Sequence, residues 1–359
     1  MVHSVRNSAG NQEGQVESER TSLETVDDLA MPARVFSGAR PTGRQHIGNY
    51  LGAIQNYVAL QDEAECFYCI VDYHALTTLE QTERIARNTR DMVLDWLAAG
   101  IDPSRTVIFA QSDVPQITEL HMLLSMIVPL SWLTRAAPFR EQSEEHPDNV
   151  NYGLLGYPVL MAGDILLYKA TTVPVGEDQL PHLELAREIA RRFNHRFGET
   201  FPVPQARLTE FPRVMGIDGT HKMSKSLDNH IELADTSEDL RMRVLSMVTD
   251  PQRRYRTDPG RPEVCNVYTL HTYYSSPQEQ AQVYHRCTNA LQGCVECKEW
   301  LSRNLDTALA PFRARWEEFA ADHERVEQIL GDGAARARSV ATETLREVRE
   351  RVGLRPSPR

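Results

Sequence analysis

The stretch "ARVFSGARPTGRQHIGNYLG", residues 33–52, decides the fold of this chain. Its first six residues have the length and apolar content of a short strand. The glycine-rich segment that follows opens into a helix, in which Leu51, Ile54 and Val58 share one face. A strand that passes through a glycine-rich turn into a helix begins a β-α-β unit, so this stretch predicts a parallel sheet.

Strand and helix signals continue to alternate along the chain. Continuous apolar runs predict buried strands at "CFYCIVD" (66–72), "RTVIFAQS" (105–112) and "TVPVG" (172–176). Amphipathic patterns predict helices at "LEQTERIARNTRDMVLDWLAAG" (79–100) and "EDQLPHLELAREIARRF" (177–193). The sequence therefore predicts an α/β fold, a Rossmann-like parallel sheet with helices on both faces.

The pattern changes after residue 230, where strand signals nearly vanish. Helices are predicted there at 237–250, 276–287, 297–330 and 334–352. We place a domain boundary near residue 229, between a Rossmann catalytic domain over 33–229 and an all-helical domain over 230–359.

Composition and charge restrict the class of protein. No apolar run reaches the roughly eighteen residues that a membrane helix needs, and residues 1–32 lack the apolar core of a signal peptide. We expect a cytoplasmic protein whose residues 1–32 are a disordered extension, or alternatively a regulatory or packing arm. Because the net charge is −11, a polyanion would need local basic surface. The stretches 187–197 and 336–359 are candidates, although each is also typical of a solvated helix face.

The first of three motifs follows the first predicted strand, at the edge of the sheet where ligands bind in open α/β folds. In "SGARPTGRQHIGNYLG" (37–52), the glycines permit a tight turn and close backbone approach, and the helix N-terminus favours an anion. His46 and Asn49 are donors three residues apart, so they share one face of the first helical turn. A histidine beside a glycine is common by chance, and its place at a strand-to-helix junction is what makes it informative.

The second motif, "VPVGEDQ" (173–179), also joins a strand end to a helix start. Asp178 is placed to accept hydrogen bonds from ribose hydroxyls, and Gly176 lets a nucleotide lie against the backbone. The alternative is an ordinary helix start, at which Glu177 and Asp178 interact with the helix dipole.

The third motif is "KMSKS" (222–226), in a stretch with glycines, polar residues and little helical periodicity. Lys222 and Lys225 can reach separate phosphate oxygens, and Ser224 and Ser226 add hydroxyl donors. Cations that close late on a pentavalent α-phosphate and on leaving pyrophosphate stabilise charge that develops in the transition state. The alternative is a solvated surface loop.

Together the motifs resemble the two signatures of class I aminoacyl-tRNA synthetases. "HIGN" (46–49) stands where that class has HIGH, and "KMSKS" matches the second signature. The stretches "CIVDYHALTT" (69–78), "GYPVLMAGDILLYKATTVPVGEDQLPHLELAREIARRFN" (156–194) and "HKMSKS" resemble tryptophanyl-tRNA synthetases, over roughly residues 34–354. Tyrosyl-tRNA synthetase is the nearest alternative. A paralogue that binds tRNA or senses a cluster without ligating is a second alternative.

The resemblance implies a tryptophan–tRNA ligase. Such an enzyme activates tryptophan with ATP and Mg²⁺ to tryptophanyl-adenylate and pyrophosphate, and then transfers tryptophan to the 3′ end of tRNA(Trp). It also implies a homodimer and a helical domain that reads the anticodon. The implied catalytic residues are His46, Asn49, Lys222 and Lys225.

The resemblance also implies two substrate sites, carried over by position. Asp164 would accept the indole N–H, which is a donor only. The implied tryptophan site is Phe36, Gly38, His74, Tyr157, Met161, Asp164, Val173, Val175 and Gln179. The implied ATP site is Arg40, Pro41, Thr42, Gly48, Asn49, Gly176, Glu177, Asp178, Val214, Met215, Lys222, Met223, Ser224, Lys225 and Ser226.

Two residues depart from the usual family pattern. Arg40 stands where many members have Gln, and it adds a fixed cation near the carboxylate or the α-phosphate. Asn49 replaces the second His of HIGH, which keeps a donor and removes an imidazolium.

The six cysteines fall into two sets. Cys66 and Cys69 lie three apart in a predicted strand and should face opposite sides, as core residues. The other four, Cys265, Cys287, Cys294 and Cys297, have the spacing C-x21-C-x6-C-x2-C, which suits Zn²⁺ or a [4Fe–4S] cluster. Unclustered structural cysteines are the alternative. The surrounding "DPGRPEVC" and "CTNALQGCVECK" resemble a tryptophanyl-tRNA synthetase subgroup with a [4Fe–4S] cluster, so we favour the cluster over zinc.

Overall fold

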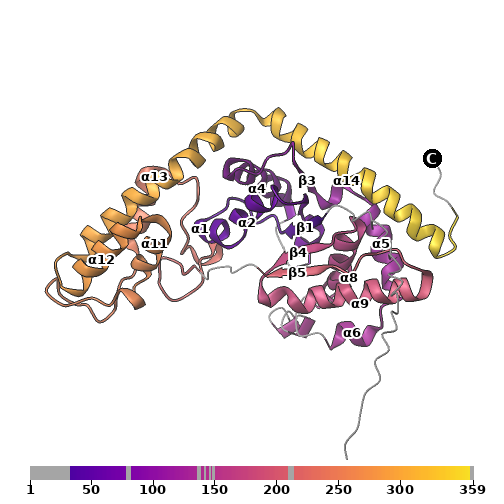
Figure 1. Ribbon diagram of the computed structural model, residues 1–359, viewed down its shortest axis with the longest axis horizontal. Coiled ribbons are helices and arrows are strands. Elements are labelled where there is room, and N and C mark those ends of the chain that lie inside the picture. The colour runs from indigo at the N-terminus through magenta and orange to yellow at the C-terminus, as the bar shows by residue number, and fades with distance from the viewer. Residues whose placement is uncertain are drawn as a thin grey trace, which may run out of the picture. The chain divides into compact units, whose positions relative to one another are not determined.

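Over the residues that the structure describes, five parallel strands form the sheet that the alternating signals predict (Figure 1). The computed structural model describes residues 33–77, 82–135, 139–140, 143–144, 147, 150–208 and 214–355. The extension predicted over 1–32 therefore lies outside the described residues. The strand order is β3-β2-β1-β4-β5, and each pair of neighbours is parallel. The strands are β1 Arg34–Ala39, β2 Glu65–Ile70, β3 Thr106–Ala110, β4 Thr172–Val175 and β5 Gln205–Leu208.

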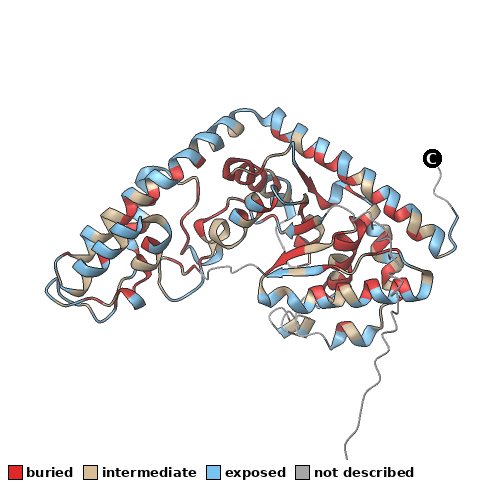
Figure 2. Ribbon diagram, in the orientation of Figure 1, coloured by how far each residue is buried: buried red, intermediate tan, exposed pale blue. Residues whose placement is uncertain are grey.

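Side chains of the central strands alternate between two hydrophobic clusters, one on each face of the sheet. In β2, Cys66 and Tyr68 belong to one cluster, and Phe67 and Cys69 belong to the other. Both cysteines are buried free thiols, as predicted. A strand that is buried on both faces needs a continuous apolar run, which explains the sequence pattern of this sheet (Figure 2).

Helices cover both faces, which confirms the predicted fold class. Among the described residues of the α/β part, the α-helices are α1 Ile47–Asn49, α2 Gln55–Leu60, α3 Asp72–Ala75, α4 Ile85–Ala99, α5 Gln116–Ser125, α6 Leu130–Thr134, α8 Tyr152–Leu167 and α9 Leu180–Phe197. A π-helical turn, Tyr50–Ile54, separates α1 from α2. Within the described part of the chain, no helix combines the length and the apolar character needed to span a membrane.

Five α-helices follow residue 230 in the part of the chain that the structure describes, in agreement with the loss of strand signals. They are α10 Ser237–Ser246, α11 Asn266–Tyr274, α12 Pro277–Thr288, α13 Cys294–Ala321 and α14 His323–Arg351. The predicted break between helices at 331–333 is wrong, because α14 runs through those residues. The chain breaks instead at Asp322, whose side chain accepts a hydrogen bond from the backbone N–H of Arg325 and caps α14.

Helix α14 returns to the sheet and packs against β3 and α5. Its Ala334, Ala337 and Ala341 belong to the same cluster as Val107 and Phe109 of β3. A Cβ on Gly333 would lie 1.8 Å from the Ile108 carbonyl oxygen, so only glycine allows this approach. The functional division near residue 229 stays a prediction.

Candidate functional site

His46 and Asn49 cap each other at the start of α1, directly beyond the carboxyl end of β1. The His46 Nδ1 accepts from the Asn49 backbone N–H at 3.2 Å, and the Asn49 Oδ1 accepts from the His46 backbone N–H at 3.1 Å. Because Nδ1 is an acceptor, the proton of the neutral ring is on Nε2. Burial first, and then electrostatic interactions with His230 and Lys225, lower the pKa of His46 to about 3. His46 is therefore a neutral hydrogen-bond donor at pH 7.

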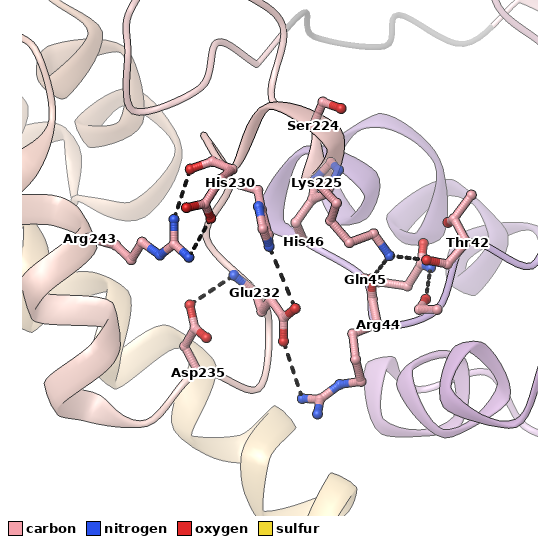
Figure 3. A network of polar contacts seen from close by, with 12 residues as sticks. Thr42, Arg44, Gln45, His46, Ser224, Lys225, His230, Glu232, Asp235 and Arg243 are labelled. Carbon is pink, nitrogen blue, oxygen red and sulfur yellow. Dashed lines mark hydrogen bonds and ion pairs between the residues drawn. The ribbon is translucent and has the colours of Figure 1, made fainter. Parts of the chain in front are cut away.

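The KMSKS loop (residues 222–226) lies beside this turn, although about 180 residues separate the two along the chain. The Lys225 ammonium donates to the backbone carbonyls of Thr42 and Arg44 (Figure 3). Burial lowers the pKa of Lys225, and the carboxylates of Glu232 and Asp95 oppose that shift. The two predicted signatures are thus brought together, with a cation lying across the loop that contains His46.

Backbone pairing fixes the two signatures in register. The Ile47 N–H donates to the Ile231 carbonyl, and the Leu233 N–H donates to the Gln45 carbonyl, both at 3.0 Å. Between these two bonds, the Glu232 carboxylate lies 3.6 Å from His230 Nε2. A short antiparallel bridge therefore joins the segment after the KMSKS loop to the turn of His46 (Figure 3).

Asp95 of α4 holds this turn in place, and the sequence analysis did not identify this residue. Its carboxylate is fully buried, accepts from the Gln45 backbone N–H, and lies 3.6 Å from Arg44 Nε. Burial raises the pKa of Asp95 to about 7, against the hydrogen bond from Gln45. A carboxylate that interrupts the apolar run "MVLDWLAA" (92–99) is the signal that could have identified it.

A cavity of about 220 Å³ opens behind the glycine-rich turn. Three residues of the predicted ATP site, Arg40, Thr42 and Asn49, line it together with Tyr57 and Trp96 of the core. Pro41 accepts from the Asn88 side chain through its carbonyl oxygen at 3.2 Å, which fixes the same loop.

The remaining predicted ATP residues outside the KMSKS loop occupy three places. Gly176 begins a short 3₁₀ turn, Glu177–Gln179, at the carboxyl end of β4, and the Asp178 carboxylate accepts from Gln179 Nε2 at 2.9 Å. Val214 and Met215 precede the KMSKS loop. Val214 accepts from the Met223 N–H at 3.0 Å, and Met215 forms a bridge with Lys222. Gly48 lies within α1 against the His46 ring.

The predicted tryptophan residues gather on one side of the sheet. Tyr157, Met161 and Asp164 are spaced four and three apart in α8, so they share one helix face. The other predicted residues on this side come from the strands and short turns: Phe36 and Gly38 in β1, His74 in α3, Val173 and Val175 in β4, and Gln179 after it. Phe36, Val173 and Val175 belong to the cluster that α8 covers.

Asp164 is the polar centre of this group. Its buried carboxylate accepts from Gln111 Nε2 at 2.9 and 2.8 Å and lies 3.0 Å from His74 Nε2. Burial raises the pKa of Asp164, and the hydrogen bond from His74 opposes the shift. Gln111 was missed, although its position directly after β3 put it at the ligand-binding edge of the sheet.

The four cysteines of the helical part lie near one another. Arg253 Nη1 lies 3.7 Å from Cys287 Sγ and 3.8 Å from Cys294 Sγ, and His271 Nε2 lies 3.6 Å from Cys297 Sγ. Burial first, and then the three other thiols, raise the pKa of Cys297 to about 12. Over the residues that the structure describes, no three His, Cys, Asp or Glu side chains form a group that could hold a metal ion.

Comparison with known proteins agrees with this geometry. The family described as tRNA synthetases class I (W and Y) matches residues 29–310. The tryptophan–tRNA ligase of Thermotoga maritima is 45% identical over 326 residues, which are 89% of this chain and 99% of that protein. A Campylobacter jejuni tryptophanyl-tRNA synthetase, solved with ADP and tryptophan, has a TM-score of 0.83 at 35% identity, and the match covers 89% of this chain and 100% of that one.

A tyrosyl-tRNA synthetase structure from Aeropyrum pernix shares the fold. Its TM-score is 0.61 at 18% identity, and the match covers 84% of this chain and 90% of that one. At that identity the likeness concerns the fold alone.

Proposed function

The chain belongs to the tryptophanyl-tRNA synthetase family, and from that premise we propose how its residues perform the reaction. It is a class I tryptophan–tRNA ligase. The α-carboxylate of tryptophan attacks the α-phosphorus of ATP, the bond to the bridging oxygen breaks, and pyrophosphate leaves. The terminal ribose hydroxyl of tRNA(Trp) then attacks the carbonyl carbon of the tryptophanyl-adenylate, and AMP leaves.

We propose that the two signatures act on the phosphates. His46 would donate from Nε2 as a neutral imidazole, beside the Asn49 amide. Lys222 and Lys225 would neutralise charge on the α-phosphate and on leaving pyrophosphate, with Mg²⁺ on the ATP. The observation that supports this most directly is the Lys225 ammonium, which already lies on the loop of His46. Positioning and charge stabilisation then suffice without a covalent nucleophile.

We propose that Asp164 selects tryptophan. A buried carboxylate can accept from an indole N–H, and Gln111 and His74 hold its oxygens in place. Phe36, Met161, Val173 and Val175 would supply the apolar surroundings of the ring, and Tyr157 and Gln179 would hold the α-ammonium end.

ATP–pyrophosphate exchange tests this assignment. Exchange should depend on tryptophan and should not be supported by tyrosine. Replacing Lys225 with Ala should slow tryptophan-dependent exchange by roughly 100-fold or more, because it removes a cation from the transition state. The dissociation constant for tryptophan should change less than two-fold. Equal losses in rate and in tryptophan binding would contradict the phosphate role of Lys225.

We also propose that Cys265, Cys287, Cys294 and Cys297 hold a [4Fe–4S] cluster, with Zn²⁺ as the alternative. Four thiols are the donor set that either group needs, and binding would have to draw the four sulfurs closer together than they lie in this structure. Arg253 lies within 3.8 Å of two of the sulfurs, so its cation would offset part of the thiolate charge. The cluster would join the start of α13 to the end of α12 as a rigid staple rather than a redox centre.

Metal analysis distinguishes these possibilities. Protein purified without oxygen should contain about four iron atoms per chain and absorb visible light, if the cluster is present. Zinc without iron would support a metal site formed by the four thiolates and would contradict the [4Fe–4S] cluster. If the protein contains neither iron nor zinc, unclustered structural cysteines would be favoured.

The helical part is proposed to read the anticodon of tRNA(Trp). Arg254, Tyr255 and Arg256 are exposed in one loop, and exposed cations beside an aromatic ring suit unstacked bases. Replacing Tyr255 with Ala should raise the KM for tRNA(Trp) in aminoacylation and leave ATP–pyrophosphate exchange unchanged.

Because its substrates are tRNA, ATP and tryptophan, we propose a cytoplasmic enzyme.

We propose a homodimer on the side of α5, α6 and α8. Four large apolar side chains of these helices are at least half exposed. They are Met122 and Met126 near the end of α5, Leu130 at the start of α6 and Tyr152 at the start of α8. Both α5 and α6 contact α8, so the three helices that carry these side chains are neighbours. Several large apolar side chains exposed in one region are typical of a protein interface.

A further inference from the structure

We propose that Asn229 is a positioning residue for adenylate formation, which holds the KMSKS loop in the shape from which its lysines act. Asn229 follows the loop by three residues, and only 2% of its surface is exposed. The inference rests on the phosphate role proposed above for Lys222 and Lys225, and it adds a residue that does not touch the substrate itself.

The side-chain amide of Asn229 closes the loop on itself. Its Oδ1 accepts from the Ser224 backbone N–H at 2.7 Å, and its Nδ2 donates to the Lys222 carbonyl at 3.3 Å. The same Nδ2 donates to Asp218 Oδ2 at 3.0 Å, before the loop begins. One amide therefore bonds to the backbone at the first and third positions of the motif and to the turn that precedes it.

The surroundings of Asn229 leave no freedom to this amide. A Cβ on Gly216 would lie 2.2 Å from the Asn229 Cγ and Nδ2, so the amide is seated directly against a glycine. The Asn229 carbonyl accepts from the Ile217 N–H at 2.8 Å, which fixes the backbone of Asn229 as well. Asp218 is fixed in turn, because its Oδ1 accepts from the backbone N–H groups of Thr220 and His221.

This arrangement fixes the backbone from which the two lysine side chains extend. Lys222 is exposed and Lys225 partly exposed, whereas Met223 between them is buried. A loop whose backbone is fixed presents both ammonium groups at a defined spacing, and a shift of about 1 Å in such groups can cost about 100-fold in rate. Replacing Asn229 should thus slow adenylate formation and leave the affinity for tryptophan unchanged.

The first test is Asn229→Asp, which keeps the shape and the acceptor but places a carboxylate against Asp218. The kcat/KM for ATP in tryptophan-dependent exchange should fall roughly 10- to 100-fold. The dissociation constant for tryptophan should stay within two-fold. A change of less than two-fold in kcat/KM would overturn the proposal.

The second test is rescue by Asp218→Asn in the same chain. The double variant exchanges the amide and the carboxylate across the 3.0 Å contact, so a donor faces an acceptor again. Thr220 and His221 can still donate to the Oδ1 of an asparagine at 218. Exchange should recover at least about five-fold over the single variant, as expected for coupled neighbours. No recovery would mean that the contact does not position the loop.

Asn194 supplies a matched control for loss of stability. It is also a buried asparagine, whose Nδ2 donates to Glu199 at 3.0 Å and whose Oδ1 accepts from the N–H groups of Thr200 and Phe201. Asn194→Asp creates the same kind of carboxylate contact at the end of α9, away from the KMSKS loop. It should lower the melting temperature without changing kcat/KM for ATP. An equal loss of exchange in both variants would reduce Asn229 to a structural role.

Lys225→Ala in the same assay separates this inference from the function on which it rests. If Lys225→Ala leaves exchange intact, the phosphate role itself fails. If Lys225→Ala slows exchange and Asn229→Asp does not, only the role of Asn229 fails.

Discussion

At the scale of single residues, contacts of two kinds hold the site together, some between near neighbours in the chain and some between residues far apart. The spacing of His46 and Asn49 indicates that they share a helical turn, and their reciprocal cap follows from that spacing. Asp95 and Gln111 lie 50 and 53 residues from their main partners, Gln45 and Asp164. Their roles depend on burial and pairing, which the fold creates. A polar residue in an apolar run can therefore be recognised from the sequence, but its hydrogen-bond partner is known only from the folded structure.

The low pKa of His46 predicts a specific pH dependence of stability. The folded-state pKa of about 3 is below the unfolded value of about 6.5. Between these values the unfolded chain binds a proton that the folded chain does not, so stability falls on acidification. From pH 7 to pH 5, His46 should account for a loss of about 2 kcal/mol in the free energy of unfolding.

His46→Gln tests this prediction, because glutamine does not titrate. Urea unfolding at pH 7 and pH 5 should show a smaller loss in the variant than in the wild type. Asp95 titrates in both proteins and with the opposite sign, since its pKa is raised, so it cancels in the comparison. The same pH dependence in both proteins would mean that His46 is protonated as easily as a free histidine.

At the scale of elements, the strands that have continuous apolar runs were predicted from the sequence. The strand that lacks such a run was not predicted. β1 to β4 correspond to the predicted segments, but β5, Gln205–Leu208, was not predicted. Its side chains are mostly exposed at the edge of the sheet, so no apolar run is required there. A helix break was also predicted over 331–333, whereas α14 continues through these residues and Gly333 allows it to approach β3 closely.

The two glycines of α14 should respond in opposite ways to alanine. At Gly333 a Cβ would lie 1.8 Å from the Ile108 carbonyl oxygen, so the helix must move from β3. Gly333→Ala should reduce the free energy of unfolding by about 2 kcal/mol or more. Gly331→Ala meets nothing within 4 Å and should stabilise the protein by up to about 1 kcal/mol through helix propensity. Urea unfolding of both variants measures this, and equal effects would contradict the packing of α14 on β3.

At the scale of the whole molecule, the site is assembled from segments far apart in sequence. Lys225 meets Thr42, and Leu233 pairs with Gln45, across more than 180 residues. Composition and periodicity could not predict these contacts. The order of the two signatures in a parallel sheet could, because carboxyl ends of such strands meet at one edge. The resemblance to a known family supplied the amino acid, which residue patterns alone left open.

The proposed homodimer gives a prediction for the assembled molecule. Met126 is 71% exposed in the region of α5, α6 and α8, and a charge there would have to be buried in an interface. Met126→Glu should therefore convert a dimer into a monomer in sedimentation equilibrium at micromolar concentration. Met242→Glu on α10 is the matched control, because Met242 is 56% exposed and outside that region, and it should leave the dimer intact. A wild-type monomer, or a dimer that persists in Met126→Glu, would show that this surface does not join two copies.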